Sequence, residues 1–314
     1  MAAQPPIAIA SVNMHWRNAV THALLNSDTG TNLFLIQEPW FDTIGTARKD
    51  TARQGIDVLG GVASPGWEVI YPSIPEGQRP KVMAYARRRA INTQFEPPFT
   101  VIPRLDVSTH PCLQVLDIIF DEETWHIINF YHNVRDGTSL QALIALDIDA
   151  VIPTLVVGDF NTHSPSWSPP DIPRSRWAGR IEEWAAANLL TLANKQGEVT
   201  RKGSDRERDS VIDLIWYNES TILKSTFSGL KVDWDGSLGS DHALLQVTAH
   251  TSRVNPQSTG HIDAGFLTDP GAKEQWIKAL RDNPAPLLLP FFPTAEEIEK
   301  AAVELMADVQ HANK

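Results

Sequence analysis

The chain has 314 residues, of which 42% are hydrophobic and 21% are charged. This composition predicts a folded globular protein with a sizeable core, and it excludes disordered, collagen-like and fibrous chains. The 27 basic and 38 acidic side chains give a formal net charge of −11. Bulk charge therefore argues against non-specific binding of DNA or anionic membranes, so any nucleic-acid contact must depend on a local patch.

The single cysteine, Cys112, cannot form an intramolecular disulfide, so folding does not require an oxidising compartment. The first residues, MAAQPPIAIASV, lack the basic stretch of a secretory signal. No apolar run reaches the roughly 18 residues of a membrane-spanning helix. We therefore expect an intracellular protein of the nucleus or cytoplasm without a membrane partner.

Short apolar runs rich in β-branched residues recur along the chain and predict strands. They lie at 7–13, 32–37, 67–71, 82–87, 113–119, 125–131, 154–158, 211–216 and 243–248. Helical periodicity lies between some of them, at 16–24, 140–145 and 177–185. Because strands joined by short turns pair antiparallel, this mixture of ββ and βα steps disfavours a doubly wound parallel sheet. It predicts an α/β fold, a four-layer sandwich of two packed mixed β-sheets flanked by helices.

The character of the chain changes after about residue 250. Residues 251–261 are polar and contain proline and glycine, which is typical of a linker or exposed loop. Thr294 and Glu297 have the spacing of a capping box, and apolar residues on one face continue the helical pattern to Val309. The apolar face of this 294–309 helix needs a partner, either the main domain, a second copy or a downstream region absent from this chain.

Polar side chains stand where several of the predicted strands end, and four of them are carboxylates: Glu38, Asp159, Asp213 and Asp241. If they converge to roughly 5 Å, each pair repels by on the order of 3 kcal/mol at an effective dielectric constant of about 20, so a cation is needed. Carboxylate and amide oxygens without a thiolate cluster suit Mg²⁺ or Mn²⁺ better than zinc. A Mg²⁺ site of this kind indicates phosphate ester chemistry.

The polar motifs are, in chain order, Asn13, Gln37-Glu38, Tyr131, Gly158-Asp159-Phe160-Asn161, Asp213 and Ser240-Asp241-His242. In this order, over residues 7 to about 250, they resemble the endonuclease/exonuclease/phosphatase superfamily. The segments GDFNTHSPSW at 158–167, SVIDL at 210–214 and SDH at 240–242 are similar to the endonuclease domain of LINE-type non-LTR retrotransposons. The resemblance implies such a domain at residues 1–250. Residues 251–314 are similar to the connector that leads to a reverse transcriptase in these elements.

The resemblance implies a metal set and an activated water. Glu38 is then the principal metal ligand, with Asn13 and Asp241 contributing directly or through water. Asp159 orients or deprotonates the attacking water, and Asn161 holds a phosphate oxygen through its amide. The alternatives are a turn residue before a proline for Glu38, and a turn in which Asp159 and Asn161 bond their own backbone.

The resemblance also implies that His242 contacts the scissile phosphate, while Asp213 fixes its tautomer and favours its protonated form. Tyr131 approaches from the opposite side, although a tyrosine at a strand end serves structural purposes just as readily. Many family members carry an acidic residue two positions after Asn13, where this chain has His15. Histidine in place of the acidic residue removes a hard oxygen ligand, which argues against a second metal.

Two local excesses of positive charge are candidates for DNA contact. One contains Arg87, Arg88 and Arg89, and the other begins with Arg201 and Lys202. The alternative for the first is a strand edge protected by charge. Trp167, in a proline-rich loop, is a candidate for stacking on a base, and the alternative is packing against its own segment.

The function that these motifs and the resemblance imply is a Mg²⁺-dependent DNA endonuclease. It nicks phosphodiester bonds by attack of activated water, leaving 3′-hydroxyl and 5′-phosphate ends. Two alternatives remain: a metal-dependent phosphomonoesterase of a small substrate, and a non-catalytic remnant that binds nucleic acid. The acidic net charge favours the phosphomonoesterase, whereas the filled catalytic positions argue against the remnant.

Overall fold

The protein is described by a computed structural model that covers residues 6–27, 29–47, 56–88, 99–120, 123–204, 207–218 and 227–250. The expected linker at 251–261, the expected helix at 294–309 and Arg89 lie outside the described residues. Within them, no helix has the length and apolar character needed to cross a membrane.

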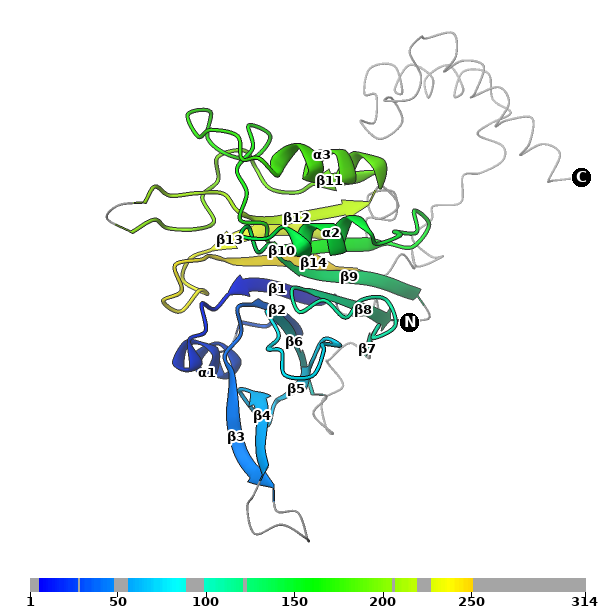
Figure 1. The fold of residues 1–314 in the computed structure, drawn as a ribbon, viewed down its shortest axis with the longest axis vertical. Coiled ribbons are helices and arrows are strands. Elements are labelled where there is room, and N and C mark those ends of the chain that lie inside the picture. The colour runs from blue at the N-terminus through cyan, green and yellow to red at the C-terminus, as the bar shows by residue number, and fades with distance from the viewer. Residues whose placement is uncertain are drawn as a thin grey trace, which may run out of the picture. The chain divides into compact units, whose positions relative to one another are not determined.

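Two six-stranded mixed sheets form the body of the fold (Figure 1). The first has the strand order β13-β14-β1-β2-β6-β5 and the second the order β11-β12-β10-β9-β8-β7. The strands of the first sheet are β1 (Ile7–Asn13), β2 (Leu33–Gln37), β5 (Trp67–Ile70), β6 (Val82–Arg87), β13 (Phe227–Asp233) and β14 (Leu244–Ala249). Those of the second are β7 (Phe99–Pro103), β8 (Leu113–Phe120), β9 (Glu123–Tyr131), β10 (Thr154–Asp159), β11 (Leu190–Leu192) and β12 (Asp213–Asn218).

Each sheet has one parallel pair at its centre, and its other neighbouring strands pair antiparallel. The parallel pairs are β1 with β2, where Asn13 lies beside Gln37, and β9 with β10, where Tyr131 lies beside Asp159. Parallel strands end at the same edge of a sheet. The two central pairs therefore present the side chains at four strand ends to a shared region between the sheets.

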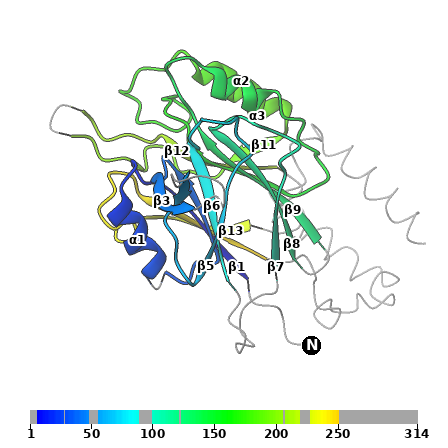
Figure 2. The same ribbon diagram turned by 60° about the horizontal axis from the view of Figure 1, so that its bottom comes forward.

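Three helices cover the outer faces (Figures 1 and 2). Helix α1 (Asn18–Asn26) packs on the first sheet, while α2 (Thr138–Ile144) and α3 (Ala178–Ala187) lie together on the second. One apolar core lies between the sheets, and a further core lies under the helices on each side. This is the predicted four-layer sandwich.

The alternation of side chains along the strands builds the central and outer cores. On β1, Ile7 and Ile9 face the second sheet, whereas Ala10 and Val12 pack toward α1. The same period of two operates on the other central strands, because successive side chains of a strand point to opposite faces. Strands buried on both faces therefore read as continuous apolar runs, which is why the sequence predicts them well.

All nine predicted strands are present, most of them with shifted ends, and so are the three helices. The hydrophobic pattern does not predict β3 (Phe41–Ala47), β4 (Ile56–Gly61), β7, β11 and β13. Of these, β7, β11 and β13 are edge strands, and β3 pairs with β4 in a separate ribbon that extends from the body in Figure 1. Edge and ribbon strands bury little apolar surface, as the exposed Ile44 and Leu59 illustrate, so their hydrophobic pattern is weak.

A buried polar layer connects the two sheets between the central core and the strand ends. Gln37 Nε2 on β2 donates to Asn129 Oδ1 on β9 at 2.7 Å and to Ser11 Oγ on β1 at 3.0 Å. Asn129 Nδ2 in turn donates to the Met83 carbonyl of β6 at 3.1 Å. Each amide is fully buried, so it depends on the other for satisfaction of its polar atoms.

We expect Gln37→Ala and Asn129→Ala to be non-additive. Each single variant leaves a buried polar group without its partner, an additional cost of about 1–3 kcal/mol, whereas the double variant removes both groups. Urea unfolding should show the double variant about 1–2 kcal/mol more stable than the sum of the single losses predicts. As a control, Ile9→Ala and Leu143→Ala, which lie in separate cores, should add. Additivity in the Gln37 and Asn129 cycle would contradict the coupling.

Candidate active site

The candidate site begins where the inner faces of both sheets change from apolar to polar. On β1 the inward series Ile7 and Ile9 continues to Asn13, and on β10 the inward series Leu155 and Val157 continues to Asp159. The strand period therefore directs Asn13 and Asp159 toward each other across the space between the sheets.

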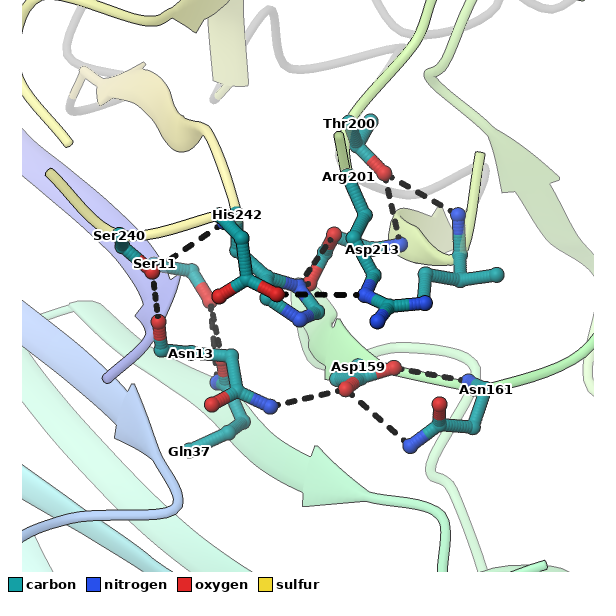
Figure 3. Close-up of polar contacts among 12 residues, drawn as sticks. Ser11, Asn13, Gln37, Asp159, Asn161, Thr200, Arg201, Asp213, Ser240 and His242 are labelled. Atoms are coloured by element: carbon teal, nitrogen blue, oxygen red, sulfur yellow. Dashed lines mark hydrogen bonds and ion pairs between the residues drawn. The ribbon is translucent and has the colours of Figure 1, made fainter. Parts of the chain in front are cut away.

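Asn13 connects the two sheets at this point (Figure 3). Its Nδ2 donates to Asp159 Oδ2 at 2.9 Å. The same Nδ2 contacts Glu38 Oε2 at 3.3 Å, while Oδ1 accepts from the His15 backbone N–H at 2.8 Å. Glu38 follows β2 and adopts a φ of 44°, an uncommon conformation for a residue other than glycine. One amide thus holds two carboxylates of opposite sheets close to each other.

Two further side chains fix these carboxylates. The Tyr131 hydroxyl donates to Glu38 Oε1 at 2.9 Å. Burial and the Glu38 carboxylate raise the pKa of Tyr131 well above its usual value, so its hydroxyl stays a donor. Asn161, which has a φ of 44°, donates its backbone N–H to Asp159 Oδ1 at 2.8 Å and its Nδ2 to Asp159 Oδ2 at 3.2 Å.

Asp213 and His242 form a buried pair. His242 Nδ1 lies 2.9 and 3.0 Å from the two carboxylate oxygens of Asp213. Thr200 Oγ1 accepts the backbone N–H of Asp213 at 3.0 Å, and Ser240 Oγ accepts that of His242 at 3.2 Å. Burial alone would lower the pKa of His242, but the Asp213 carboxylate outweighs it and raises the pKa to about 9. The imidazole is therefore protonated at neutral pH in the metal-free protein.

Asp159 lies beside this pair and is fully buried. Burial, followed by the negative charge of Asp213, raises the pKa of Asp159 to about 7, although His242 and Asn13 act in the opposite direction. Ligand atoms of Asp159, Asp213 and His242 all lie within 4.8 Å of one another. A carboxylate whose pKa lies this near neutrality is suited to accept a proton from water.

Asp241 lies at the edge of the site. Arg201 Nε is 3.5 Å from its Oδ2 and His15 Nδ1 is 3.9 Å from its Oδ1. Its Oδ1 is buried yet has no hydrogen-bond partner. Burial raises the pKa of Asp241, but His242, His15 and Arg201 together lower it below its usual value. A buried carboxylate oxygen that is ionised and lacks a hydrogen bond is a fitting ligand for a cation.

The donor chemistry fits a hard divalent cation on one set of residues better than on another. Glu38, Asn13 and Asp241 offer carboxylate and amide oxygens, which Mg²⁺ and Mn²⁺ prefer. Asp213 and His242 are less suitable, since both Asp213 oxygens are engaged by a protonated imidazole.

The structure separates the candidate DNA contacts. Arg201 and Lys202 lie near the site, because the Lys202 backbone N–H donates to the Asp241 carbonyl at 2.8 Å. Arg87 ends β6 at the opposite edge of the first sheet, where its Nε donates to the Thr31 carbonyl at 3.0 Å. Arg88 follows it there, so these two residues lie away from the site, and their contact with DNA stays a prediction.

The structure corrects the interpretation of Trp167 as a residue that stacks on a base. It is fully buried in the core under α2 and α3, and its Nε1 donates to the Thr162 carbonyl at 2.9 Å. Its indole has no face open to a base, so the packing alternative holds. The sequence did not predict the role of Thr200 as a support for Asp213, since a lone threonine in a polar segment carries no recognisable spacing.

Comparisons with known proteins agree with this arrangement. A family model described as endonuclease-reverse transcriptase matches residues 125–246. The endonuclease domain of TRAS1, a telomere-specific non-LTR retrotransposon, aligns with a TM-score of 0.59 and 15% identity over 78% of this chain and 98% of that one. A search of curated proteins finds no match.

Two more distant structures align over similar lengths. An endonuclease/exonuclease/phosphatase family protein from Leptotrichia buccalis has a TM-score of 0.44 and 12% identity over 78% of this chain and 99% of that one. Beta toxin from Staphylococcus aureus, in a structure with bound magnesium ions, has a TM-score of 0.43 and 10% identity over 78% of this chain and 100% of that one.

The family model over residues 125–246 and the likeness in fold to the TRAS1 endonuclease domain agree with the resemblance of the ordered motifs to the endonuclease/exonuclease/phosphatase superfamily.

We expect Asp159→Asn to stabilise the metal-free protein. Because the folded-state pKa of Asp159 is raised to about 7 from an ordinary value of 3.8, the folded protein resists its ionisation. The resulting penalty is absent below pH 4, grows as the pH rises and is complete above pH 7. Urea unfolding with a chelator should therefore show a gain for the variant that increases from pH 4 to 7.

The matched control for this prediction is Asp171→Asn on an exposed loop, where the same change should have little effect at any pH. Equal stability of Asp159→Asn and the wild type at pH 8 would contradict the expected strain at Asp159.

Proposed function

We propose that this protein is a Mg²⁺-dependent DNA endonuclease that nicks phosphodiester bonds. The observation that carries the proposal is the contact of the Asn13 amide with both Glu38 and Asp159. It places a group suited to metal binding directly beside a group suited to accept a proton from water. Hydrolysis requires a water molecule that contacts the proton-accepting group and faces a phosphate ester held by the metal.

Glu38, Asn13 and Asp241 would hold the cation, and Mn²⁺ would satisfy the same oxygen ligands. Bound there, the cation would neutralise negative charge on the phosphate as it develops in the transition state. Tyr131 would keep Glu38 oriented through its hydrogen bond. The replacement of an acidic residue by His15 supports one metal position rather than two.

Asp159 would accept the proton of the attacking water, and its contacts with Asn13 and Asn161 would keep its oxygens in position. Since Asp213 engages Nδ1 of His242, the Nε2 proton would be donated to a non-bridging phosphate oxygen. Asn161 would hold another phosphate oxygen through its amide, in place of its present contact with the His132 carbonyl. Attack from the Asp159 side would break the bond to the 3′ oxygen, leaving a 3′-hydroxyl and a 5′-phosphate.

The nucleus or cytoplasm is the proposed location. The fold buries the only cysteine, Cys112, as a free thiol, and therefore has no need of an oxidising compartment. We also propose that the catalytic domain ends near residue 250 and that residues 251–314 are a connector. Its helix at 294–309 would bind a partner through its apolar face.

We expect conversion of supercoiled plasmid to open circles in Mg²⁺ or Mn²⁺ but not with a chelator. Glu38→Gln and His242→Ala should each lower the rate by about 10²–10⁴, because they remove a cation ligand and a phosphate donor. Exposed Glu68→Gln and His22→Ala are the matched controls and should nick at the wild-type rate.

Unchanged nicking by purified Glu38→Gln would refute the assigned metal site. Release of inorganic phosphate from small esters, with no nicks in any metal, would favour the phosphomonoesterase. Tight binding of DNA without metal and without any turnover would favour the non-catalytic remnant.

The chemistry of the ends provides an independent test. DNA ligase seals a nick only between a 3′-hydroxyl and a 5′-phosphate, so we expect it to reclose the open circles without prior end repair. Circles that become sealable only after phosphatase and kinase treatment would contradict the proposed direction of bond cleavage.

A further inference from the structure

Three tryptophans around the candidate site each carry a cation over the ring. Lys81 Nζ lies 3.9 Å from the ring centroid of Trp16. Arg176 Cζ lies 4.5 Å from that of Trp177, and Lys202 Nζ lies 4.5 Å from that of Trp234. We call these the three rim pairs.

The first rim pair is attached to Glu38 on both sides. The Trp16 backbone N–H donates to the Glu38 carbonyl, and the Glu38 N–H donates to the Lys81 carbonyl, both at 2.8 Å. His15 and Trp16 have φ angles of 45° and 61°, so two successive residues adopt a strained conformation to place this indole. Only Met14 separates this turn from Asn13.

The other two rim pairs are attached to the remaining site carboxylates. Lys202 donates its backbone N–H to the Asp241 carbonyl at 2.8 Å. The Trp177 ring packs edge-on against His132 at 5.8 Å, and the His132 N–H donates to the Asp159 carbonyl at 2.8 Å. Each of the three pairs is therefore linked to a different carboxylate residue of the site.

Several other basic groups of the described chain contact carboxylates, unlike the cations of the rim pairs. They are Arg79, Arg104, Arg174, Arg201, Arg208 and Lys231. In the part of the chain that the structure describes, no carboxylate lies within 4.0 Å of Lys81, Arg176 or Lys202. In a protein with a net charge of −11, three cations without a carboxylate partner around an acidic site are available for phosphates.

The indoles of the rim pairs offer aromatic surface for stacking on bases, in addition to the cations that contact phosphates. Trp16, Trp177 and Trp234 are all partly exposed, unlike Trp167. Aromatic faces stack on bases and cations contact the backbone, which is the combination that binds unpaired nucleic acid. In a continuous duplex the bases are stacked inside, so the indoles would gain no base contact there.

We propose that the three rim pairs form a binding surface for DNA with unpaired bases beside the scissile phosphate. This proposal rests on the proposed endonuclease function for its substrate. It extends that function by assigning a preference for single-stranded or locally unpaired DNA over continuous duplex.

The test is binding in the presence of a chelator, which separates it from cleavage. Fluorescence anisotropy would be measured with labelled oligonucleotides that are single-stranded, fully paired, or paired with an internal unpaired stretch. We expect the two substrates with unpaired bases to bind at least tenfold more tightly than the duplex. Trp16→Ala and Trp234→Ala should each weaken that binding by about 5-fold to 100-fold, with little effect on the duplex.

Two further variants identify the chemistry. Trp16→Phe retains an aromatic face and should keep most of the affinity, which distinguishes stacking from a loss of fold. Lys81→Gln should weaken all three substrates and lower the slope of binding against salt by about one ion. Arg104→Gln, which removes an ion-paired cation outside the rim pairs, should change nothing.

Equal affinity for duplex and single-stranded DNA would overturn the proposal, and so would unchanged binding by both tryptophan variants. A preference for unpaired DNA that both variants reduce would support it even if no nicking occurs, because binding is measured without metal. Nicking without such a preference would support the endonuclease function and refute the proposed role of the rim pairs in binding unpaired DNA.

Discussion

The contact between one neutral amide and two carboxylates determines the geometry of the candidate site. Asn13 belongs to the first sheet and Asp159 to the second, so the hydrogen bond between them fixes the separation of the sheets at their strand ends. Glu38 and Asp159 would otherwise repel, and the amide N–H groups offset part of that repulsion before any cation binds. Farther into the core, the hydrogen bond between Gln37 and Asn129 also connects the two sheets, but without a charged group. The site therefore continues the polar layer beneath it.

Strand periodicity explains why so much of the site could be predicted from the sequence. Asn13, Asp159 and Asp213 stand at the ends of strands whose apolar runs are unmistakable, so their positions follow once the strands are placed. The motifs then give the order of the partners, since Asp213 and His242 lie 29 residues apart yet meet across β12 and the start of β14. What the sequence cannot supply is the direction in which a side chain outside this periodicity points.

Two of the candidates for DNA contact illustrate that limit. Arg87 belongs to a basic run, but β6 is antiparallel to β2, so the strand carries this residue to the edge opposite the site. Trp167 lies in a polar, proline-rich loop, yet that loop folds back and buries the indole in the core beside Trp216. Conversely, Trp16, Lys81 and Lys202 are far apart in the sequence and carry no shared motif. Only the tertiary fold reveals that the first two lie beside Glu38 and that Lys202 lies beside Asp241.

The distribution of charge suggests why the fold tolerates such an expensive site. Among the described residues, the cationic partner of the buried Asp159 and Asp213 is His242, and this cost must be offset by packing elsewhere. The strands that carry Asn13, Asp159 and Asp213 also carry the apolar cores of the fold. A rigid frame of this kind keeps like charges together when no cation is present. The carboxylates are then already arranged when a cation and a phosphate arrive, so binding need not reorganise them. The same negative charges that repel each other in the metal-free protein attract the cation.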